Sequence, residues 1–356
     1  MMKRIVLTGG GTAGHVTPHL ALIPHLLSAG YEIHYVGTPD GIERTMMEKM
    51  DSITYHAVES GKLRRYFDLK NVSDAFKVLK GCFQADRLMK ELKPDVCFSK
   101  GGFVAVPVVR GAYRAGVPVL CHESDLTPGL ANRLCVKYAR KIACTFPECA
   151  KAMGEKGVHT GTPLREALFE GSRQEGLRLS GFDGSRPILL MTGGSLGAQS
   201  VNKALREALP EITKRFDVVH LTGKGNLDET LLNHPAYRQF EFVTDEMPHL
   251  LSAADIVLSR AGSNTLCELQ ALKKPMLLVP YPLGASRGDQ ILNAKSFRER
   301  GIAHVLDQDQ MNKDTLSAAI NDLYESRESL IAALEKEPAA NGTEKILRLI
   351  EEIQRK

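Results

Sequence analysis

The sequence predicts an α/β protein made of two Rossmann-like, doubly wound domains that face each other across a cleft. Short apolar runs alternate with longer helical periods along nearly the whole chain, which is typical of parallel sheets covered by helices. A glycine-rich turn follows the first apolar run of each half. The length of 356 residues also exceeds what a single core usually fills.

The alternation of elements restarts near the middle of the chain. In the first half we expect strands at 4–8, 32–36, 53–58, 96–99, 117–121 and 141–144, with helices near 17–29, 72–92, 104–115 and 129–138. In the second half we expect strands at 188–192, 218–222, 240–243, 256–259, 276–279 and 304–306, with helices near 197–209, 264–271, 289–300 and 313–325. The Gly-, Ser- and charge-rich segment 161–184 predicts a hinge. We therefore expect domains at 1–163 and 164–339, with a C-terminal helix within 340–356 packed back onto the first.

Composition excludes several classes of protein. Hydrophobic residues make up 43% and charged residues 25%, as in soluble globular proteins. A net charge of +4 is too small to predict wholesale nucleic-acid binding. No stretch approaches the roughly 20 apolar residues that span a bilayer, and the chain starts directly with a strand, so a cytosolic protein is expected. The seven cysteines form no C-x-x-C pair, which favours reduced thiols.

The two glycine-rich turns carry the first functional signal. One spans 9–15 and the other 193–198, and each lies between a short apolar run and a helical segment. Such turns present backbone N–H groups at a helix N-terminus, where a phosphate or sugar-phosphate binds. Two further turns, at 99–103 and 259–263, also follow predicted strands. Because ligands collect beyond the carboxyl ends of parallel strands, these turns predict a diphosphate-containing substrate.

A dinucleotide cofactor is the first alternative. Gly9, Gly11 and Gly14 satisfy the G-x-G-x-x-G pattern literally. That pattern needs an acidic residue at the end of the second strand, yet this strand ends at 35–38 and Asp40 lies beyond it. A single dinucleotide also leaves the second glycine turn unexplained. We expect no organic cofactor.

Several side chains near these turns could carry chemistry. Glu268, a turn or more into a helix, could accept two hydrogen bonds from a ribose diol, although an exposed helix glutamate is the simpler interpretation. Gln290 and Asn293 are likewise ordinary residues at the start of a helix until a partner is named. His15 follows the first turn directly, where a neutral imidazole could take a proton from a hydroxyl.

Metal binding finds little support. His15 and His19 have the i, i+4 spacing of a metal pair, but Pro18 lies between them and no carboxylate or third ligand accompanies them. The D-x-D segment 307–309 follows a late strand away from the glycine turns, which favours a solvated loop. We expect no metal held by the protein.

Taken together, the turns resemble those of the MurG family, bacterial transferases that add N-acetylglucosamine to undecaprenyl-pyrophosphoryl-muramyl-pentapeptide in peptidoglycan synthesis. The matching segments occur in order through both halves: GGTAGHVTP (10–18), GGFVAVP (101–107), HESDLTPGLANR (122–133), GTPLR (161–165), GGSLGAQSVN (193–202), SRAGSNTLCE (259–268) and GDQILNA (288–294).

The resemblance implies a GT-B glycosyltransferase fold. It implies that the second domain, 164–339, holds UDP-N-acetylglucosamine, and that the first, 1–163, faces the acceptor and the membrane. In family terms Ser195 meets the diphosphate, the backbone near Val243 meets the uracil, and Gln290 meets the sugar. The remaining donor contacts implied are Thr12, Ala13, Gly14, Arg165, Ser263, Asn264, Thr265 and Glu268.

The resemblance also implies an inverting reaction that needs no D-x-D metal. The 4-hydroxyl of the acceptor sugar attacks the anomeric carbon while a base removes its proton. His15 is the leading candidate for the base or an acceptor-orienting group, with Glu123 and Asp125 as alternatives. One departure concerns Asp125, which stands in HESD where other members carry Asn in HEQN, so its contact with the substrate can differ.

A polyprenyl-linked acceptor requires contact with the inner leaflet of the cell membrane, so we expect a peripheral protein on the cytoplasmic face. The expected contact lies near the helix predicted at 72–92. Its apolar residues are Val72, Phe76, Leu79 and Phe83, and its basic neighbours are Lys62, Arg64, Arg65, Lys70, Lys77 and Lys80. The simpler alternative is that the apolar residues form the core face of the helix. Two other functions remain open, a UDP-sugar epimerase of similar architecture and a non-catalytic nucleotide-sugar sensor.

Overall fold

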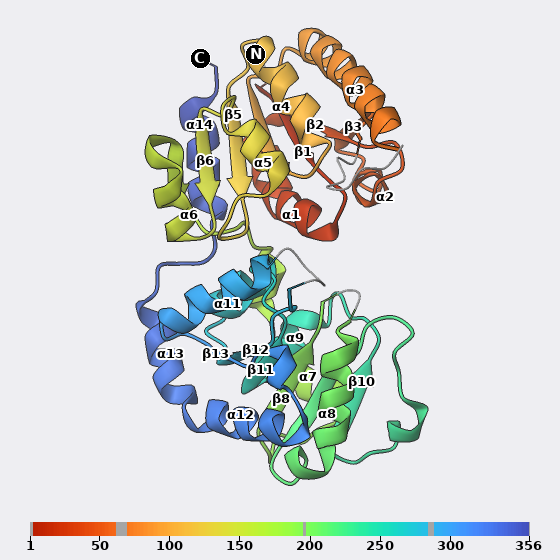
Figure 1. The fold of residues 1–356 in the computed structure, drawn as a ribbon, viewed down its shortest axis with the longest axis vertical. Coiled ribbons are helices and arrows are strands. Elements are labelled where there is room, and N and C mark those ends of the chain that lie inside the picture. The colour runs from red at the N-terminus through yellow and green to blue at the C-terminus, as the bar shows by residue number, and fades with distance from the viewer. Residues whose placement is uncertain (1–2, 62–69, 195–196, 284–287, 356) are drawn as a thin grey trace. The chain divides into compact units, whose positions relative to one another are not determined.

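The chain forms two compact units in a computed structural model (Figure 1). The model describes residues 3–61, 70–194, 197–283 and 288–355, with only the backbone of 70–75. The first unit comprises Met1–Arg165 and Asn341–Lys356, and the second comprises Glu166–Ala340. Among the described residues, no helix is long and apolar enough to cross a membrane.

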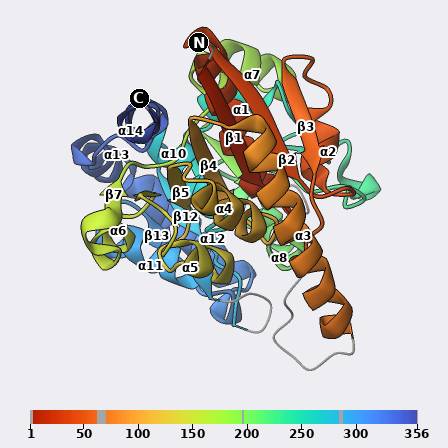
Figure 2. The same cartoon turned by 90° about the horizontal axis from the view of Figure 1, so that it is seen from above.

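The first unit is a parallel sheet with strand order β3-β2-β1-β4-β5-β6-β7, covered by helices. Its strands are β1 (Lys3–Gly9), β2 (Tyr31–Gly37), β3 (Ile53–Ala57), β4 (Val96–Gly101), β5 (Val119–Glu123), β6 (Lys141–Cys144) and β7 (Gly157–His159). Its helices are α1 (Ala13–Ser28), α2 (Ile42–Met47), α3 (Lys70–Leu92), α4 (Ala105–Arg114), α5 (Leu130–Cys135), α6 (Pro147–Ala152) and α14 (Thr343–Ile353). The central strands are buried on both faces, as parallel strands between helical layers must be. The long helix α3 packs against α4 and is seen along its length in Figure 2.

The last helix of the chain belongs to the first unit. Helix α14 packs beside α1 and against β4, β5 and β6 (Figure 1), because Ile346, Leu349, Ile350 and Ile353 form one buried stripe. The returning chain is held where it re-enters the unit, since the N–H of Gly342 donates to the carbonyl of Thr162 at 2.8 Å.

The second unit repeats the design with strand order β10-β9-β8-β11-β12-β13, again all parallel. Its strands are β8 (Ile188–Thr192), β9 (Asp217–Leu221), β10 (Tyr237–Phe240), β11 (Ile256–Ser259), β12 (Met276–Leu278) and β13 (His304–Val305). Its helices are α7 (Arg173–Ser180), α8 (Gln199–Ile212), α9 (Met247–Ala253), α10 (Ser263–Ala271), α11 (Asp289–Glu299), α12 (Lys313–Glu325) and α13 (Arg327–Lys336). One core lies between β8, β9 and β11 and the helices α8 and α12.

The structure confirms the predicted fold class of two doubly wound α/β units. One strand was predicted at the wrong place. The strand expected at 240–243 lies three residues earlier, because Tyr237–Phe240 pair with β9 and form β10. The N–H of Thr222 donates to the carbonyl of Phe240 just beyond the paired residues, so Glu241–Val243 lie in a loop. The short elements α2, α6, β7, α7, α9 and α13 were also missed, since a period of so few residues is hard to recognise in a sequence.

Candidate active site

In the second unit, the turns predicted to bind the substrate lie at one edge of the sheet. The strands β10, β9, β8 and β11 are neighbours and parallel, so the segments that follow their carboxyl ends lie together. These segments are 193–194 and 197–198 after β8, 222–225 after β9, 241–246 after β10 and 260–263 after β11. A shared edge of this kind is where open α/β sheets bind nucleotides.

A pocket of about 110 Å³ lies at this edge. It brings together three predicted residues, Val243, Thr265 and Glu268, which come from two separate segments. The other lining residues are Thr192, Gly194, Leu221, Glu241, Phe242, Met247, Leu251 and Leu269. The pocket therefore has an apolar wall and two carboxylates, Glu241 and Glu268, a combination that can hold a nucleoside.

Helix α10 starts beside this pocket. Gly262 is its N-cap residue and leaves open space where a Cβ would stand, while Ser263 is buried and Asn264 half-buried. The first turn of this nine-residue helix presents the positive end of its dipole. Gln290, in the first turn of α11, accepts a hydrogen bond from the N–H of Tyr281 at 3.2 Å through Oε1. The predicted diphosphate contact Ser195 lies outside the described residues.

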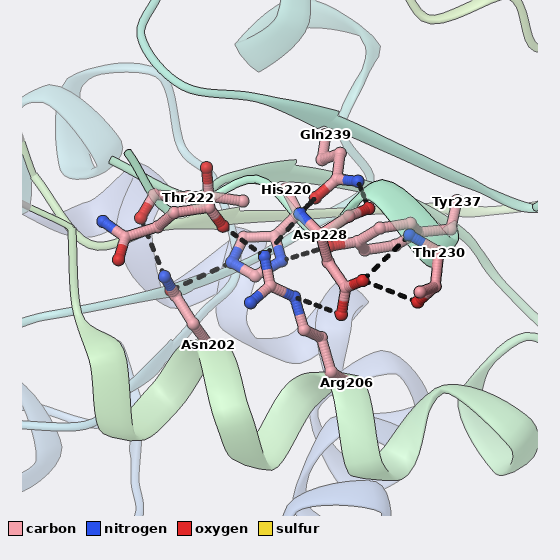
Figure 3. A network of polar contacts seen from close by, with 9 residues as sticks. Asn202, Arg206, His220, Thr222, Asp228, Thr230, Tyr237 and Gln239 are labelled. Carbon is pink, nitrogen blue, oxygen red and sulfur yellow. Dashed lines mark hydrogen bonds and ion pairs between the residues drawn. The ribbon is translucent and has the colours of Figure 1, made fainter. Parts of the chain in front are cut away.

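A buried network of hydrogen bonds joins Asn202, His220 and Tyr237 to the carbonyl of Thr222, which packs against the second glycine turn (Figure 3). The Asn202 amide donates to the carbonyl of Thr222 at 2.7 Å, so the Asn202 Oδ1 atom faces His220 Nε2 at 3.0 Å. His220 Nδ1 lies 2.8 Å from the Tyr237 hydroxyl. The amide of Asn202 fixes the tautomer, since Nε2 must carry the proton and Nδ1 must accept one from the tyrosine.

The protonation state of His220 agrees with this arrangement. Burial, followed by the charge of Arg206, lowers the pKa of His220 to about 3, which keeps the ring neutral. The network positions the carbonyl of Thr222 against the second turn, where a Cβ on Gly197 would stand 2.3 Å from that oxygen. Gly197 also has φ +72°, so only glycine fits there without strain.

The outer part of the same network fixes the loop after β9 (Figure 3). Arg206 Nε lies 4.0 Å from Asp228, and Arg206 Nη2 donates to the Gln239 amide oxygen at 3.4 Å. Asp228 in turn accepts from the N–H and hydroxyl of Thr230 at 3.1 and 2.6 Å. These contacts tie α8, the loop after β9 and β10 together beneath the pocket edge.

A buried cation joins the remaining segments of this edge. Arg260 is 5% exposed, and its guanidinium donates to the carbonyl of Val279 at 2.9 Å, to Ser200 Oγ at 2.9 Å and to Gln308 Oε1 at 2.7 Å. Its carbon Cζ lies 4.0 Å from the centre of the Tyr281 ring. These four partners carry no charge, so none of them offsets the positive charge of Arg260.

In the first unit, the predicted catalytic histidine lies at the start of α1. His15 is half-buried, and its Nδ1 atom lies 2.8 Å from the Thr12 hydroxyl. Thr12 is the N-cap residue, and Ala13 and Gly14 form the first turn with His15. If Nδ1 donates to Thr12, then Nε2 carries the lone pair that a general base needs.

The turn after β4 packs directly on the first glycine turn. A Cβ on Gly102 would stand 2.4 Å from the carbonyl oxygen of Gly10, and Gly102 has φ +84°. Beneath it, the ammonium of Lys100 is 1% exposed and donates to His122 Nδ1 at 2.9 Å and to the Ser124 hydroxyl. Burial and then Lys100 hold the pKa of His122 well below its usual range, so His122 stays neutral.

The two alternative bases differ in exposure. Glu123 is 5% exposed and accepts hydrogen bonds from the Asp125 N–H at 3.1 Å, the Gly129 N–H at 3.1 Å and the Asn132 amide at 2.8 Å. Burial raises its pKa. The Glu123 carboxylate therefore organises the loop after β5, whereas the half-buried Asp125 lies on that loop's surface side.

Comparison with known proteins assigns both units. Residues 5–144 match the glycosyltransferase family 28 N-terminal domain, and residues 188–352 match the glycosyltransferase family 28 C-terminal domain. A Clostridium tetani protein named UDP-N-acetylglucosamine–N-acetylmuramyl-(pentapeptide) pyrophosphoryl-undecaprenol N-acetylglucosamine transferase is 53% identical over 352 residues, which cover 99% of this chain and 98% of that protein. A Lachnospira eligens protein with the same name is 54% identical, covering 99% of both chains. The crystal structure of Acinetobacter baumannii MurG matches with a TM-score of 0.80 at 26% identity, covering 98% of this chain and 99% of that one.

The chain belongs to the MurG family of glycosyltransferase family 28. This finding confirms the resemblance that the ordered motifs indicated, and with it the GT-B fold. Arg165 is exposed and lies at the point where the chain leaves the first unit of this MurG family member. Its predicted role in donor binding stays a prediction.

Sequence reasoning missed several residues of this MurG family site. Phe242 is 61% exposed at the pocket and lies where a strand was predicted. Gln308 sits in the middle of the D-x-D segment, where its side chain holds Arg260 while Asp307 and Asp309 are exposed. Only long-range packing shows these roles. Within the described ranges, no group of three or more His, Cys, Asp or Glu side chains is arranged to hold a metal ion.

Proposed function

We propose that this chain transfers N-acetylglucosamine from UDP-N-acetylglucosamine to the 4-hydroxyl of the muramyl sugar of undecaprenyl-pyrophosphoryl-muramyl-pentapeptide. The observation that carries the proposal is identity of 53–54% over nearly the full length to proteins named as that transferase. The pocket that joins Val243, Thr265 and Glu268 in the second unit supports it. The product is the disaccharide-bearing lipid used in peptidoglycan synthesis.

We assign the donor contacts by the chemistry of each group. The backbone at Val243 and the ring of Phe242 suit the uracil, and the Glu268 carboxylate suits the ribose diol because it can accept two hydrogen bonds. The second glycine turn with Ser195 and the start of α10 (Ser263 and Asn264) suit the diphosphate. Gln290 is our candidate for the sugar contact. Arg165 and the segment 12–14 complete the donor site in this proposal.

The reaction is a displacement at the anomeric carbon. The acceptor oxygen forms the new bond as the bond to the UDP oxygen breaks, which inverts the configuration, and a base takes the acceptor proton. We assign that base to His15, held by Thr12 with Nε2 as the acceptor, with Asp125 and Glu123 as alternatives. Charge that builds on the diphosphate is stabilised by helix N-termini, by about 0.3–1 kcal/mol each when exposed and more when dry. The proposed mechanism uses no metal or organic cofactor.

The acceptor places the protein at the membrane. On α3, Phe76, Leu79 and Phe83 are 69, 56 and 74% exposed, so the alternative that they form a core face is wrong. Lys77 and Lys80 lie on the same stretch of helix. We propose that this face meets the anionic inner leaflet as a peripheral contact, where each basic residue contributes about 1 kcal/mol and inserted aromatic rings add to it. Lys62, Arg64 and Arg65 lie outside the described residues, and the side chains of Lys70 and Val72 are not described.

UDP release tests the proposed function. The purified chain is mixed with UDP-N-acetylglucosamine, with and without a short-chain lipid-linked muramyl-pentapeptide, and the product mass is recorded. Release that needs the acceptor and yields a disaccharide lipid supports the transferase. Turnover of the nucleotide sugar without acceptor would indicate an epimerase, and donor binding without turnover would indicate a sensor. Sedimentation with vesicles containing anionic lipid, compared with Phe76→Ser, tests the membrane contact.

A further inference from the structure

The first glycine turn already holds an anion that belongs to the chain. The Glu43 side chain, in the first turn of α2, is fully buried. Its Oε2 atom accepts a hydrogen bond from the N–H of Gly11 at 3.1 Å. Its Oε1 atom accepts from the N–H and the hydroxyl of Thr38 at 3.0 and 2.6 Å. An N–H group of the G-x-G-x-x-G turn is therefore bound to a carboxylate within the same unit.

The surrounding backbone is shaped to this carboxylate. A Cβ on Gly10 would stand 2.4 Å from the carboxyl carbon of Glu43, and one on Gly41 would stand 2.2 Å from its Oε1 atom. A Cβ on Gly37 would stand 2.7 Å from Glu43 Cγ. Three glycines thus enclose the Glu43 side chain. Burial alone raises the pKa of Glu43, but hydrogen bonds from Thr38 and Gly11 outweigh it and leave the pKa below the usual value, so the group is charged.

A filled turn has a direct consequence for ligands. In dinucleotide-binding domains the amides of this turn bind the phosphates. Here a phosphate near Gly11 would have to compete for the same N–H group and would meet a buried negative charge. The carboxylate packs closely against Gly10, Gly37 and Gly41, so the turn is built around it.

A pocket of about 500 Å³ lies beside the filled turn, wholly within the first unit. Its charged lining residues are Asp40, Glu59 and Lys77. Glu59 also forms an ion pair with Lys80 at 3.2 Å, so with Glu43 behind the turn three carboxylates are balanced by two ammonium groups. Phe103 adds an aromatic surface. A pocket of this size and charge suits a neutral sugar with part of a substituent better than a diphosphate.

We propose that Glu43 determines specificity by filling the anion position of the first glycine turn, so that the adjacent pocket receives the uncharged muramyl sugar of the acceptor and excludes its diphosphate. The inference rests on the proposed function, because it assigns one part of that acceptor to one pocket. It gives the two glycine turns of the chain opposite tasks. Glu43 acts through the turn and does not touch the reacting atoms.

Inorganic pyrophosphate is the probe for the filled turn. The full chain is labelled with ¹⁵N-glycine, and the amide signals of Gly11 and Gly194 are followed during a pyrophosphate titration of the wild type, Glu43→Gln and Glu59→Gln. We expect no saturable shift of Gly11 in the wild type or in the Glu59→Gln control. In Glu43→Gln, which keeps the shape of the side chain, Gly11 should shift with an affinity at least about tenfold higher, since like charges a few ångströms apart repel strongly in a partly buried site.

Two results of this titration would overturn the proposal. One is a saturable Gly11 shift in the wild type, and the other is a folded Glu43→Gln protein that gains no pyrophosphate binding. If Glu43→Gln does not fold, the wild-type titration decides alone. UDP-N-acetylglucosamine added to the same sample reports on Gly194. If UDP-N-acetylglucosamine did not shift the Gly194 amide signal, the result would count against the proposed function. The Gly11 result would still stand.

Steady-state inhibition provides a second readout. In the wild type we expect pyrophosphate to compete with the donor and not with the lipid acceptor. In Glu43→Gln it should compete with both, because the first turn can then hold the anion. Competition with the acceptor in the wild type would overturn the assignment of the pocket to the muramyl sugar.

Discussion

The two glycine turns share a sequence pattern and differ in what they hold. In the first, the N–H of Gly11 donates to the buried carboxylate of Glu43, and the space around Gly10 is filled. In the second, a Cβ on Gly193, the position equivalent to Gly10, would meet backbone atoms of Gly197 and Ala198 in the turn itself, and the turn packs on the carbonyl of Thr222. A glycine pattern therefore predicts backbone shape, and the packing of neighbouring side chains decides whether an anion can bind.

The difference also separates two kinds of chemistry. The first turn presents a titratable imidazole, His15, at the start of α1. The second turn lies near a buried cation, Arg260, which contacts uncharged groups within the described part of the chain, and near a pocket with two carboxylates. We therefore expect proton transfer to depend on the first turn and donor binding to depend on the second.

Replacing His15 by Ala gives the largest expected effect. Loss of a general base typically lowers the rate by about 10²- to 10⁴-fold, so kcat should fall in that range. Donor affinity, measured by calorimetry with UDP-N-acetylglucosamine, should stay close to wild type because donor binding rests mainly on the second unit. Thr12→Val should lower kcat in the same direction and by less, since it removes only the hydrogen bond that orients the ring.

His25→Ala is the matched control, because His25 lies on the same helix in its last turn. It should keep kcat near the wild-type value. Full turnover in the His15 variant would remove its catalytic role and direct attention to Asp125. A weakened donor affinity in that variant would instead show that the first turn contributes to donor binding as well as to proton transfer.

Alanine at Gly102 and at Gly194 tests the close contact between the turn after β4 and the first glycine turn. Both glycines have positive φ, +84° and +79°, so each substitution carries the same left-handed cost of about 1–2 kcal/mol. Only Gly102 adds a contact with the Gly10 carbonyl at 2.4 Å, so its total cost should reach about 3 kcal/mol or more. Thermal unfolding by scanning calorimetry measures both. Equal losses would mean that the contact between Gly102 and the Gly10 carbonyl adds no cost beyond the positive φ.

Removing the carboxylate of Glu268 tests donor binding at the second turn. Glu268→Ala should raise the donor Kd by about ten- to a hundredfold, because hydrogen bonds to a charged group contribute roughly 1.5–3 kcal/mol. Calorimetric titration with UDP separates this from any effect on turnover. Glu246→Gln is the control. Glu246 is the exposed N-cap residue of α9, and its carboxylate accepts a hydrogen bond from the Thr244 N–H. An unchanged Kd in Glu268→Ala would assign the ribose to another group.

Most of the fold could be predicted from the sequence, because alternating apolar and helical periods are local signals. The first four strands of the second sheet in space, β10, β9, β8 and β11, follow the doubly wound order that such alternation implies. The end of β10 could not be read locally, since Tyr237–Phe240 and Glu241–Val243 are both apolar or mixed runs and only pairing with β9 separates them.

The candidate site was predictable where a residue lies in a turn after a strand or in the helix that begins there, as Thr265 and Glu268 do in α10. It was not predictable where function depends on distant packing. Nothing near Glu43 in the sequence indicates that its carboxylate reaches Gly11, 32 residues earlier. Likewise Gln308 reaches Arg260 across 48 residues. Such contacts are properties of the folded unit, so they appear only in the structure.

Lowering the pH should give the smallest effect, a loss of folding stability that is similar around the two turns. His19 lies beside Gly9 in the first unit, and His220 supports the second turn. Burial is the main cause that lowers the pKa of each to about 3, assisted by Lys100 for His19 and by Arg206 for His220. Well above pH 6.5 each imidazole ring is neutral in both the folded and the unfolded protein. As the pH falls below that value only the unfolded state gains a proton, so stability is lost progressively towards about pH 3.

Between about pH 7 and pH 6, one-proton linkage predicts a loss of about 0.7 kcal/mol for each histidine. Urea unfolding at the two pH values, followed by hydrogen exchange of peptides from α1 and α8, measures the loss in each unit separately. His19→Gln should remove it from the first unit alone, and His220→Gln from the second alone. A pH dependence that survives in both variants would assign the acid sensitivity to other groups. A loss confined to one unit would show that the turns differ in their buried histidines as well as in the anion they admit.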